Sequence, residues 1–250
     1  TIGLIEHKLE EHRLLKSAKL NVVNPGQTVD FGAMKVEFIR TTHSIPDACS
    51  LAIHTPVGVV VHTGDFKIDY TPIDGEMMDF GRLAELGNRG VLALMSDSTN
   101  SERKGYTMSE STVGEVLDKL FINCTKRIVV ATFSSNVHRV QQIVNSAVKY
   151  GRKVAICGRS MINTIETARK FGYIKVPDNV FIDIDMIKSY PDDRLTIITT
   201  GSQGETMSAL TRMASGEHKK VQITPNDLII ISANPIPGNE NAVSKVIDDL

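Results

Sequence analysis

One stretch decides the fold of this chain: RIVVATFSSN, at residues 127–136. Residues 127–132 form an apolar run that predicts a buried strand, and the polar residues 133–136 then predict a loop. Val140, Ile143 and Val144 follow at helical spacing, so a helix with one apolar face comes next. The stretch is therefore a strand–loop–helix unit.

Three further units of the same kind follow along the chain. Their strands are predicted at 154–157, 195–199 and 228–232, their polar loops at 158–160, 201–204 and 234–239, and their helices end near 171, 214 and the last residue. Four strand–loop–helix units in a row predict an α/β fold in which helices cover a parallel sheet.

The first part of the chain has a different pattern, richer in strands. Strands are predicted at 34–41, 57–61 and 91–95, and helices near the start and at 79–86. The pattern changes near residue 107, where Thr107-x-x-Glu110 fits a capping box. The helix that follows is expected to turn one face inward, with Val113, Val116, Leu117 and Leu120.

Composition excludes several classes of protein. The 250 residues carry a formal net charge of −1, with 41% hydrophobic and 23% charged residues, which is typical of a soluble globular protein. No apolar run approaches the roughly 18 residues that cross a bilayer, and no signal peptide is expected. The three cysteines are scattered, which argues against a disulfide framework or a cysteine zinc site and favours a reducing compartment, the cytoplasm.

The near-neutral total hides a local excess of positive charge. Residues 126–175 contain ten Lys and Arg and one acid, Glu166. Such a block favours an anionic partner, most often nucleic acid. A solvated basic face, balanced by the acids that follow, is an equally good interpretation of charge alone.

The loop after the first of the four strands is the best candidate for phosphate binding. Ser134, Ser135 and Asn136 precede a helix, and His138 and Arg139 follow in its first turn. Helix N-termini favour phosphate, but Ser135 or Asn136 could equally cap the helix. The loop at 201–204 is also ambiguous, and it matches neither GxGxxG nor GxxxxGK[ST].

Three polar residues lie near predicted strand ends in the first part of the chain. They are His43, Asp65 and Asp97. A histidine and carboxylates at strand ends can converge on a divalent metal ion. Taken singly, each is more often a helix cap or a hydrogen-bonded loop residue.

Taken together, seven segments resemble the ribonuclease J family, in the β-CASP branch of the metallo-β-lactamase superfamily. In order they are HSIPD at 43–47, HTGDFK at 62–67, SDSTN at 96–100, FSSNVHR at 133–139, GRSM at 158–161, TGSQGE at 200–205 and PIPGNE at 235–240. Each is weak alone, but seven in order across nearly the whole chain are specific.

The resemblance implies a hydrolase with two zinc ions that cleaves RNA, both endonucleolytically and from a 5′-monophosphate end in the 5′-to-3′ direction. His43 matches a metal-binding motif, Asp65 matches the carboxylate that bridges the two metals, and Asp97 matches an acid that orients a neighbouring histidine ligand. Residues 134–136 match the loop that binds substrate phosphate. The resemblance also implies a homo-oligomer in the full-length protein.

Two family motifs have no counterpart here. The string His-x-His-x-Asp-His and the later Gly-His-Ala-Ser are both absent from the sequence. We therefore expect residues 1–105 to be the C-terminal part of a metallo-β-lactamase-like αββα domain and residues 106–250 to be the β-CASP domain. On its own, the chain is expected to be inactive.

Two other functions remain open at this stage. One is a non-catalytic RNA-binding module, and the other is an α/β enzyme that acts on a small phosphorylated metabolite. RNA binding with a steep dependence on salt would exclude the metabolite enzyme.

Overall fold

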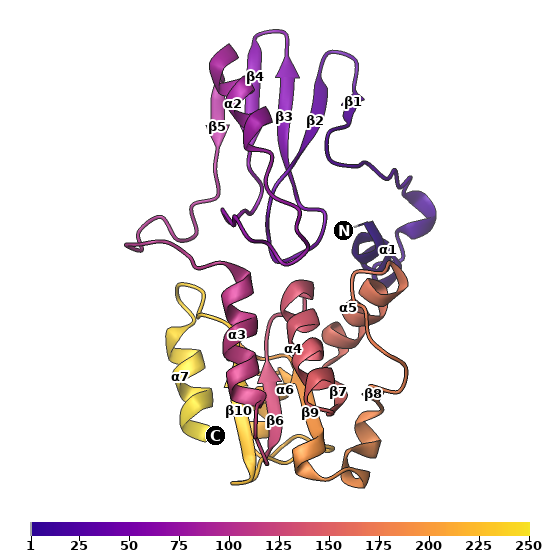
Figure 1. The fold of residues 1–250 in the computed structure, drawn as a ribbon. Coiled ribbons are helices and arrows are strands. Elements are labelled where there is room, and N and C mark those ends of the chain that lie inside the picture. Colours follow the sequence, from indigo (N-terminus) through magenta and orange to yellow (C-terminus); the bar gives the residue numbers. More distant parts are fainter. Residues whose placement is uncertain (1) are drawn as a thin grey trace. The chain divides into compact units, whose positions relative to one another are not determined.

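A computed structural model describes residues 2–250, except for the side chains of Leu4 and His7. The contacts within it divide the chain into two compact units, Thr1–Thr112 and Val113–Leu250, called unit 1 and unit 2 below. Each has its own five-stranded sheet, called sheet A in unit 1 and sheet B in unit 2 (Figure 1).

Sheet A is mainly antiparallel and has the strand order β1-β2-β3-β4-β5. Its strands are β1 (Thr28–Asp30), β2 (Lys35–Arg40), β3 (Cys49–Thr55), β4 (Gly58–His62) and β5 (Ala93–Met95), and the helices of this unit are α1 (Ile2–Glu11), η1 (Leu15–Ser17) and α2 (Phe80–Arg89). The sequence analysis predicted β2, β4, β5 and α2. It missed β1 and β3, whose polar residues weaken the apolar pattern of a strand.

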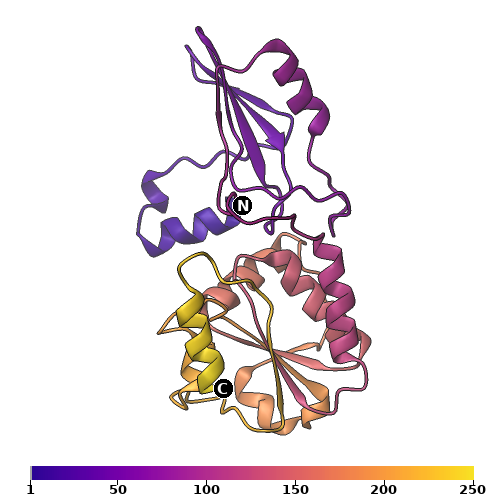
Figure 2. The same cartoon turned by 90° about the vertical axis from the view of Figure 1, so that its left-hand side faces the viewer.

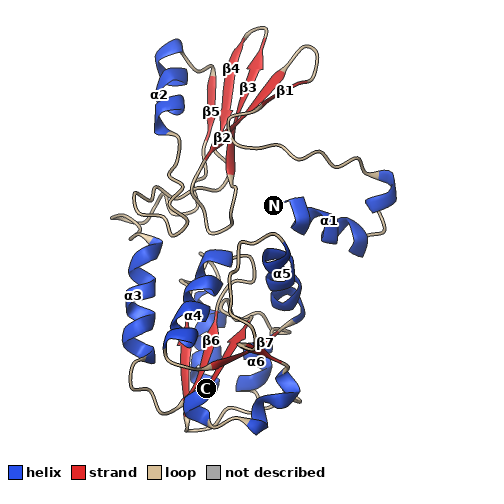
Figure 3. Ribbon diagram, turned by 45° about the vertical axis from the view of Figure 1, so that its right-hand side comes forward, coloured by secondary structure: helices blue, strands red, loops and turns tan. Residues whose placement is uncertain are grey.

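Helix α2 packs against one face of sheet A through a small apolar core (Figure 3). Ile39, Ala52 and Val61 of the sheet and Leu86 of the helix are buried there. An ion pair between α2 and the sheet accompanies this core.

An ion pair of Arg82 with Glu37 fastens α2 to the sheet. The Arg82 guanidinium donates to Glu37 Oε1 at 2.6 Å and to Oε2 at 2.9 Å, and His54 Nε2 lies 3.1 Å from the same Oε2. The Glu37 side chain is only 10% exposed. The hydrogen bonds from Arg82 hold the pKa of this carboxyl below its ordinary value, with a smaller contribution from His54.

Sheet B is parallel throughout and has the strand order β10-β6-β9-β7-β8. Its strands are β6 (Arg127–Ala131), β7 (Lys153–Cys157), β8 (Phe181–Ile182), β9 (Leu195–Thr199) and β10 (Asp227–Ile231). The helices are α3 (Glu110–Phe121), which begins in unit 1, and α4 (Val137–Lys149), α5 (Arg159–Lys170), η2 (Ile184–Ser189), η3 (Asp192–Arg194), α6 (Ala209–Ala214) and α7 (Glu240–Asp249). The predicted α/β class is confirmed, with the four predicted units observed as β6-α4, β7-α5, β9-α6 and β10-α7.

Both faces of sheet B are buried, as a parallel sheet requires. Ile128 and Val130 of β6 point to the side covered by α3, α4 and α5, whereas Val129 and Ala131 point to the side of α6 and α7. Figure 2 shows the strands running through the middle of the unit with helices around them. We therefore expect the functional polar side chains of unit 2 in the loops at the strand ends.

The predicted capping box at Thr107 is wrong. Helix α3 begins at Glu110, and the Glu110 amide donates to Asp69 Oδ2 at 2.9 Å. The predicted inward face also needs correction, because Val116 is 52% exposed while Leu117 and Phe121 are buried. The local cap is Ser109, whose hydroxyl accepts from the Ser111 amide at 3.3 Å, and a carboxylate 41 positions away adds a second acceptor for the first turn.

The Arg82–Glu37 pair predicts a pH-dependent stability. Arg82→Met keeps an unbranched apolar stem but removes the guanidinium and leaves Glu37 buried with only His54, and it should lower the free energy of unfolding of unit 1 by about 3 kcal/mol at pH 7. Because the folded pKa of Glu37 is lowered, its contribution is present above the ordinary glutamate pKa, roughly 4.3, and is lost as the pH falls through the folded value. Urea unfolding at pH 7 and pH 3 should therefore show a smaller difference between variant and wild type at pH 3.

Glu85→Gln provides the matched control. Glu85 also pairs with Arg82, at 2.6 Å, but its side chain is 60% exposed. Its replacement should cost at most about 1 kcal/mol. Equal losses of the free energy of unfolding in Arg82→Met and Glu85→Gln would show that the buried Arg82–Glu37 pair contributes no more than the exposed Arg82–Glu85 pair.

Candidate nucleic-acid site

The three candidate metal-site residues of unit 1 lie at one edge of sheet A. Strand β2 is antiparallel to β3, β3 is antiparallel to β4, and β4 is parallel to β5. Strands β2, β4 and β5 therefore run in the same direction and end at the same edge. His43 follows β2, Asp65 follows β4 and Asp97 follows β5.

Asp97 connects the loops at this edge. Its Oδ1 accepts hydrogen bonds from the Thr99 amide at 2.9 Å and the Thr99 hydroxyl at 2.7 Å, and its carboxylate also accepts one from the Phe66 amide. The bonds from Thr99, then those from Phe66 and the charge of His43, hold the pKa of Asp97 below its ordinary value. Asp97 is thus an ionised acceptor in contact with the residue that follows Asp65, and it lies close enough to His43 to sense its charge.

His43 and Asp65 do not make a metal site by themselves. His43 is half-buried and Asp65 is exposed. Among the side chains of residues 2–250 that the structure describes, which leave out His7, no group of three or more His, Cys, Asp and Glu is arranged to hold a metal ion. The fold brings the three predicted residues to one edge, but the ligands present do not fit a complete two-metal centre.

A second set of loops meets at the carboxyl edge of sheet B, where ligands of parallel sheets bind. The Thr132 amide donates to Thr199 O at 3.1 Å, and the Ser232 amide donates to Ala131 O at 2.8 Å. These bonds continue the sheet beyond its last strand residues. They hold the loops after β6, β9 and β10 side by side.

Asn136 caps helix α4. Its side-chain oxygen accepts a hydrogen bond from the Arg139 amide at 2.9 Å, which is the capping role that the sequence had left open. Ser134 is half-buried and Ser135 is exposed in the preceding turn, and His138 is half-buried in the first turn of the helix. The phosphate-binding role of these residues stays a prediction.

Arg139 is oriented by the end of β10. Its Nη1 donates to the Ser232 carbonyl at 2.8 Å and to the Ser232 hydroxyl at 2.7 Å. These two bonds tie the guanidinium to the end of β10 and so fix its direction. The sequence predicted a cation one turn into the helix but could not predict this partner, 93 positions away.

Gln203 is a residue that the sequence analysis did not single out. Its side chain is buried, its Nε2 donates to Asn234 O at 3.0 Å, and its Oε1 accepts from the Ile236 amide at 2.7 Å. The amide group therefore joins the loop after β9 to the loop after β10. The sequence signal for it was the segment TGSQGE at 200–205, one of the seven that carry the family resemblance.

Comparison with known proteins now identifies the family. The sequence model described as "Ribonuclease J, beta-CASP domain" matches residues 125–250, which include the whole of sheet B. The chain belongs to the ribonuclease J family.

Curated ribonuclease J proteins align with the whole chain. The chain is 52% identical to "Ribonuclease J" of Synechocystis sp. over 100% of its length and 39% of the relative's, and 49% identical to "Ribonuclease J" of Helicobacter pylori strain 26695 over 100% and 36%. It is 43% identical to "Ribonuclease J2" of Bacillus subtilis over 99% and 45%. The chain thus spans less than half the length of these ribonuclease J relatives.

A solved structure shares the fold. It is a protein of unknown function from Enterococcus faecalis V583, with a TM-score of 0.52 and 19% identity over 72% of this chain and 44% of that one. Among residues 2–250, no helix combines the length and apolar character that crossing a bilayer requires.

Close packing of the loop after β9 against the backbone of α7 predicts which of two glycines tolerates replacement less well. A Cβ on Gly204 would lie 2.4 Å from the carbonyl carbon of Ala242, whereas a Cβ on Gly216 would meet nothing within 4 Å. Their φ angles are nearly equal, +71° and +74°. Gly216→Ala should cost about 1–2 kcal/mol for the left-handed conformation, and Gly204→Ala at least about 2 kcal/mol more because of the clash. The midpoints of urea unfolding measure both, and equal losses would contradict this account.

Proposed function

We propose that this chain is part of an enzyme that cleaves RNA, both endonucleolytically and in the 5′-to-3′ direction from a 5′-monophosphate end. The match of residues 125–250 to the β-CASP domain of ribonuclease J is the observation that carries the proposal. The 43–52% identity to proteins named ribonuclease J, across the whole chain, supports it. A small phosphorylated metabolite as the substrate has no comparable support.

In this proposal, the loop after β6 binds the phosphate at the 5′ end of the RNA. Ser134 and Ser135 supply hydroxyl and amide donors, and Asn136 holds the first turn of α4 in place. Arg139 adds positive charge at the same helix end, where the dipole also favours an anion, and His138 lies beside it in the first turn. Anchoring the 5′ phosphate would set the register of cleavage.

The edge of sheet A contributes part of a metal centre in the full-length enzyme, which we propose holds two zinc ions. His43 and Asp65 would act as ligands, Asp65 bridging the two metals, and Asp97 would orient a neighbouring histidine. The remaining ligands would come from residues outside this chain. In this proposal residues 1–105 are part of a metallo-β-lactamase-like domain, residues 106–250 are the β-CASP domain, and the chain alone does not turn over RNA.

We further propose that the full-length protein is a homo-oligomer that acts in the cytoplasm. All three cysteines are free thiols, which suits a reducing compartment. The protein would bind its RNA partner in that compartment.

Removal of one hydroxyl tests the phosphate site. In the full-length enzyme, Ser134→Ala should weaken binding of 5′-monophosphate RNA roughly 10- to 100-fold, because a hydrogen bond to a charged group contributes about 1.5–3 kcal/mol. RNA with a 5′-hydroxyl lacks this anion and should lose little. The measurement compares the Kd values of both RNAs for wild type and variant.

Ser215→Ala is the control, since Ser215 lies at the C-terminal end of α6, away from this loop. It should leave both Kd values unchanged. If Ser134 only stabilises the turn before the Asn136 cap, its loss should lower stability and affect both RNAs alike. Such an equal effect would remove the phosphate-site assignment.

A further inference from the structure

The block of ten basic residues at 126–175 separates into two groups in the structure. Some form internal contacts: Arg127 pairs with Asp227 at 2.6 Å, Arg152 is buried and donates to the Leu195 carbonyl at 3.0 Å, and Lys149 pairs with Asp118. Internal contacts are also made by Lys126 with Pro225 O, Arg139 with Ser232 and Lys153 with Asn179 O. The other four, Arg159, Arg169, Lys170 and Lys175, are exposed.

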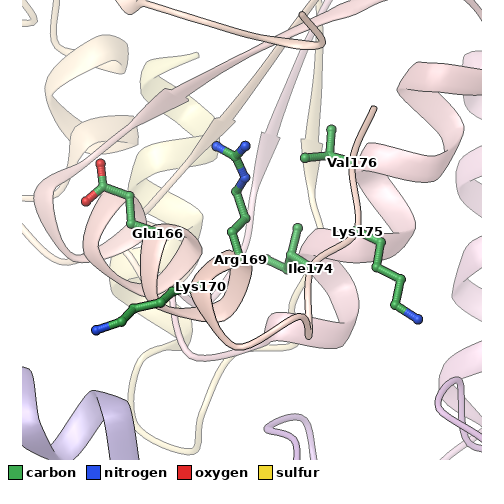
Figure 4. A pocket seen from close by; sticks show the side chains of 6 residues that line it. All are labelled: Glu166, Arg169, Lys170, Ile174, Lys175 and Val176. Carbon is green, nitrogen blue, oxygen red and sulfur yellow. The ribbon is translucent and has the colours of Figure 1, made fainter. Parts of the chain in front are cut away.

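Three of these four cations line one hollow on unit 2 (Figure 4). The hollow has a volume of about 580 Å³ and is lined by Glu166, Arg169, Lys170, Ile174, Lys175 and Val176. Figure 4 shows the ammonium groups of Lys170 and Lys175 pointing to opposite sides, with the Arg169 side chain between them. Positive charge is therefore spread along the hollow and is not focused on one point.

The end of helix α5 holds this segment in a defined shape. The Gly172 amide donates to Arg169 O at 3.0 Å and the Tyr173 amide donates to Ala168 O at 2.8 Å, the two bonds of a Schellman motif. Gly172 has a φ of +75°, which suits glycine at this position. The helix dipole also favours cations here, at its C-terminal end.

The same turn presents two aromatic side chains among the cations. Phe171 is 46% exposed and Tyr173 is 39% exposed. Further along, Lys175 is fixed through its backbone, because its amide donates to Gln141 Oε1 at 2.7 Å and its carbonyl accepts from Gln141 Nε2 at 2.9 Å. Arg169 is held over the ring of Phe181, 5.2 Å from its centroid.

We propose that residues 169–175, called the basic–aromatic strip below, bind single-stranded RNA. Cations interleaved with exposed aromatic rings are what a single strand needs, because the cations contact phosphates and the rings stack on bases of any sequence. The wide separation of Lys170 and Lys175 suits a chain of phosphates better than one compact anion. The inference rests on the proposed RNA substrate and adds a contact that does not depend on the 5′ end.

Binding of the 250-residue chain to a fluorescent single-stranded 15-mer RNA with a 5′-hydroxyl, followed by anisotropy between 50 and 200 mM salt, tests the strip. The double variant K170Q/K175Q should reduce the slope of log K against log[salt] by about 1.4, since each lost phosphate contact removes about 0.7. The control K188Q/K219Q removes the same charge from two other exposed lysines of unit 2 and should leave the slope nearly unchanged.

The aromatic side chains give a second readout, which is coupled to the first because Lys170 Nζ lies 5.7 Å from the centroid of the Phe171 ring. Phe171→Leu combined with Tyr173→Leu keeps apolar bulk but removes the stacking faces, and it should weaken binding about 5- to 100-fold with little change in the salt slope. Equal thermal unfolding midpoints for variant and wild type would show that the fold is intact.

Three results would overturn the strip. The first is an equal change of the salt slope in K170Q/K175Q and K188Q/K219Q. The second is the absence of RNA binding by the chain at 50 mM salt. The third is equal competition by inorganic phosphate and RNA at matched phosphate concentration, which would indicate a single-anion site. The Ser134→Ala comparison of 5′ ends in the full-length enzyme tests the proposed function separately from the strip. The 5′-hydroxyl RNA used to test the strip does not occupy the 5′-phosphate site.

Discussion

Sheet B has to bury both of its faces, and the rest of unit 2 depends on that constraint. A parallel strand has helices on either side, so its side chains must be apolar in both directions. In β6 and β9, side chains facing α3–α5 alternate with side chains facing α6 and α7, and all but one of these ten residues are buried. Arg127, the charged residue of these two strands, lies at the start of β6, away from the loops at the carboxyl edge of the sheet.

This constraint explains why much of unit 2 could be predicted from its sequence. A strand buried on both faces is a continuous apolar run, and a helix that covers it has one apolar stripe, so β6-α4 and its successors stand out. Sheet A gives a weaker signal. Strand β3 carries His54 and Thr55 beside apolar residues, and β1 has three residues, so neither has a clear pattern.

What the sequence could not predict were contacts between residues far apart in the chain. Asp69 accepts from the first amide of α3, and Asp227 neutralises Arg127 within what had looked like a continuous basic block. The candidate site likewise combines features that follow from strand order with contacts between distant residues. The positions of His43, Asp65 and Asp97 at one edge follow from strand direction, whereas the partner of Arg139 and the bridging role of Gln203 depend on the folded loops.

In the proposed function, unit 2 recognises RNA, whereas unit 1 supplies only part of the metal ligands. The most direct measurement incubates the purified chain with a 5′-monophosphorylated single-stranded RNA and Zn²⁺ and follows both binding and the length of the RNA. The account predicts binding that weakens steeply as salt is raised, while the RNA stays intact. Cleavage of the RNA by a chain that retains stoichiometric zinc would contradict it.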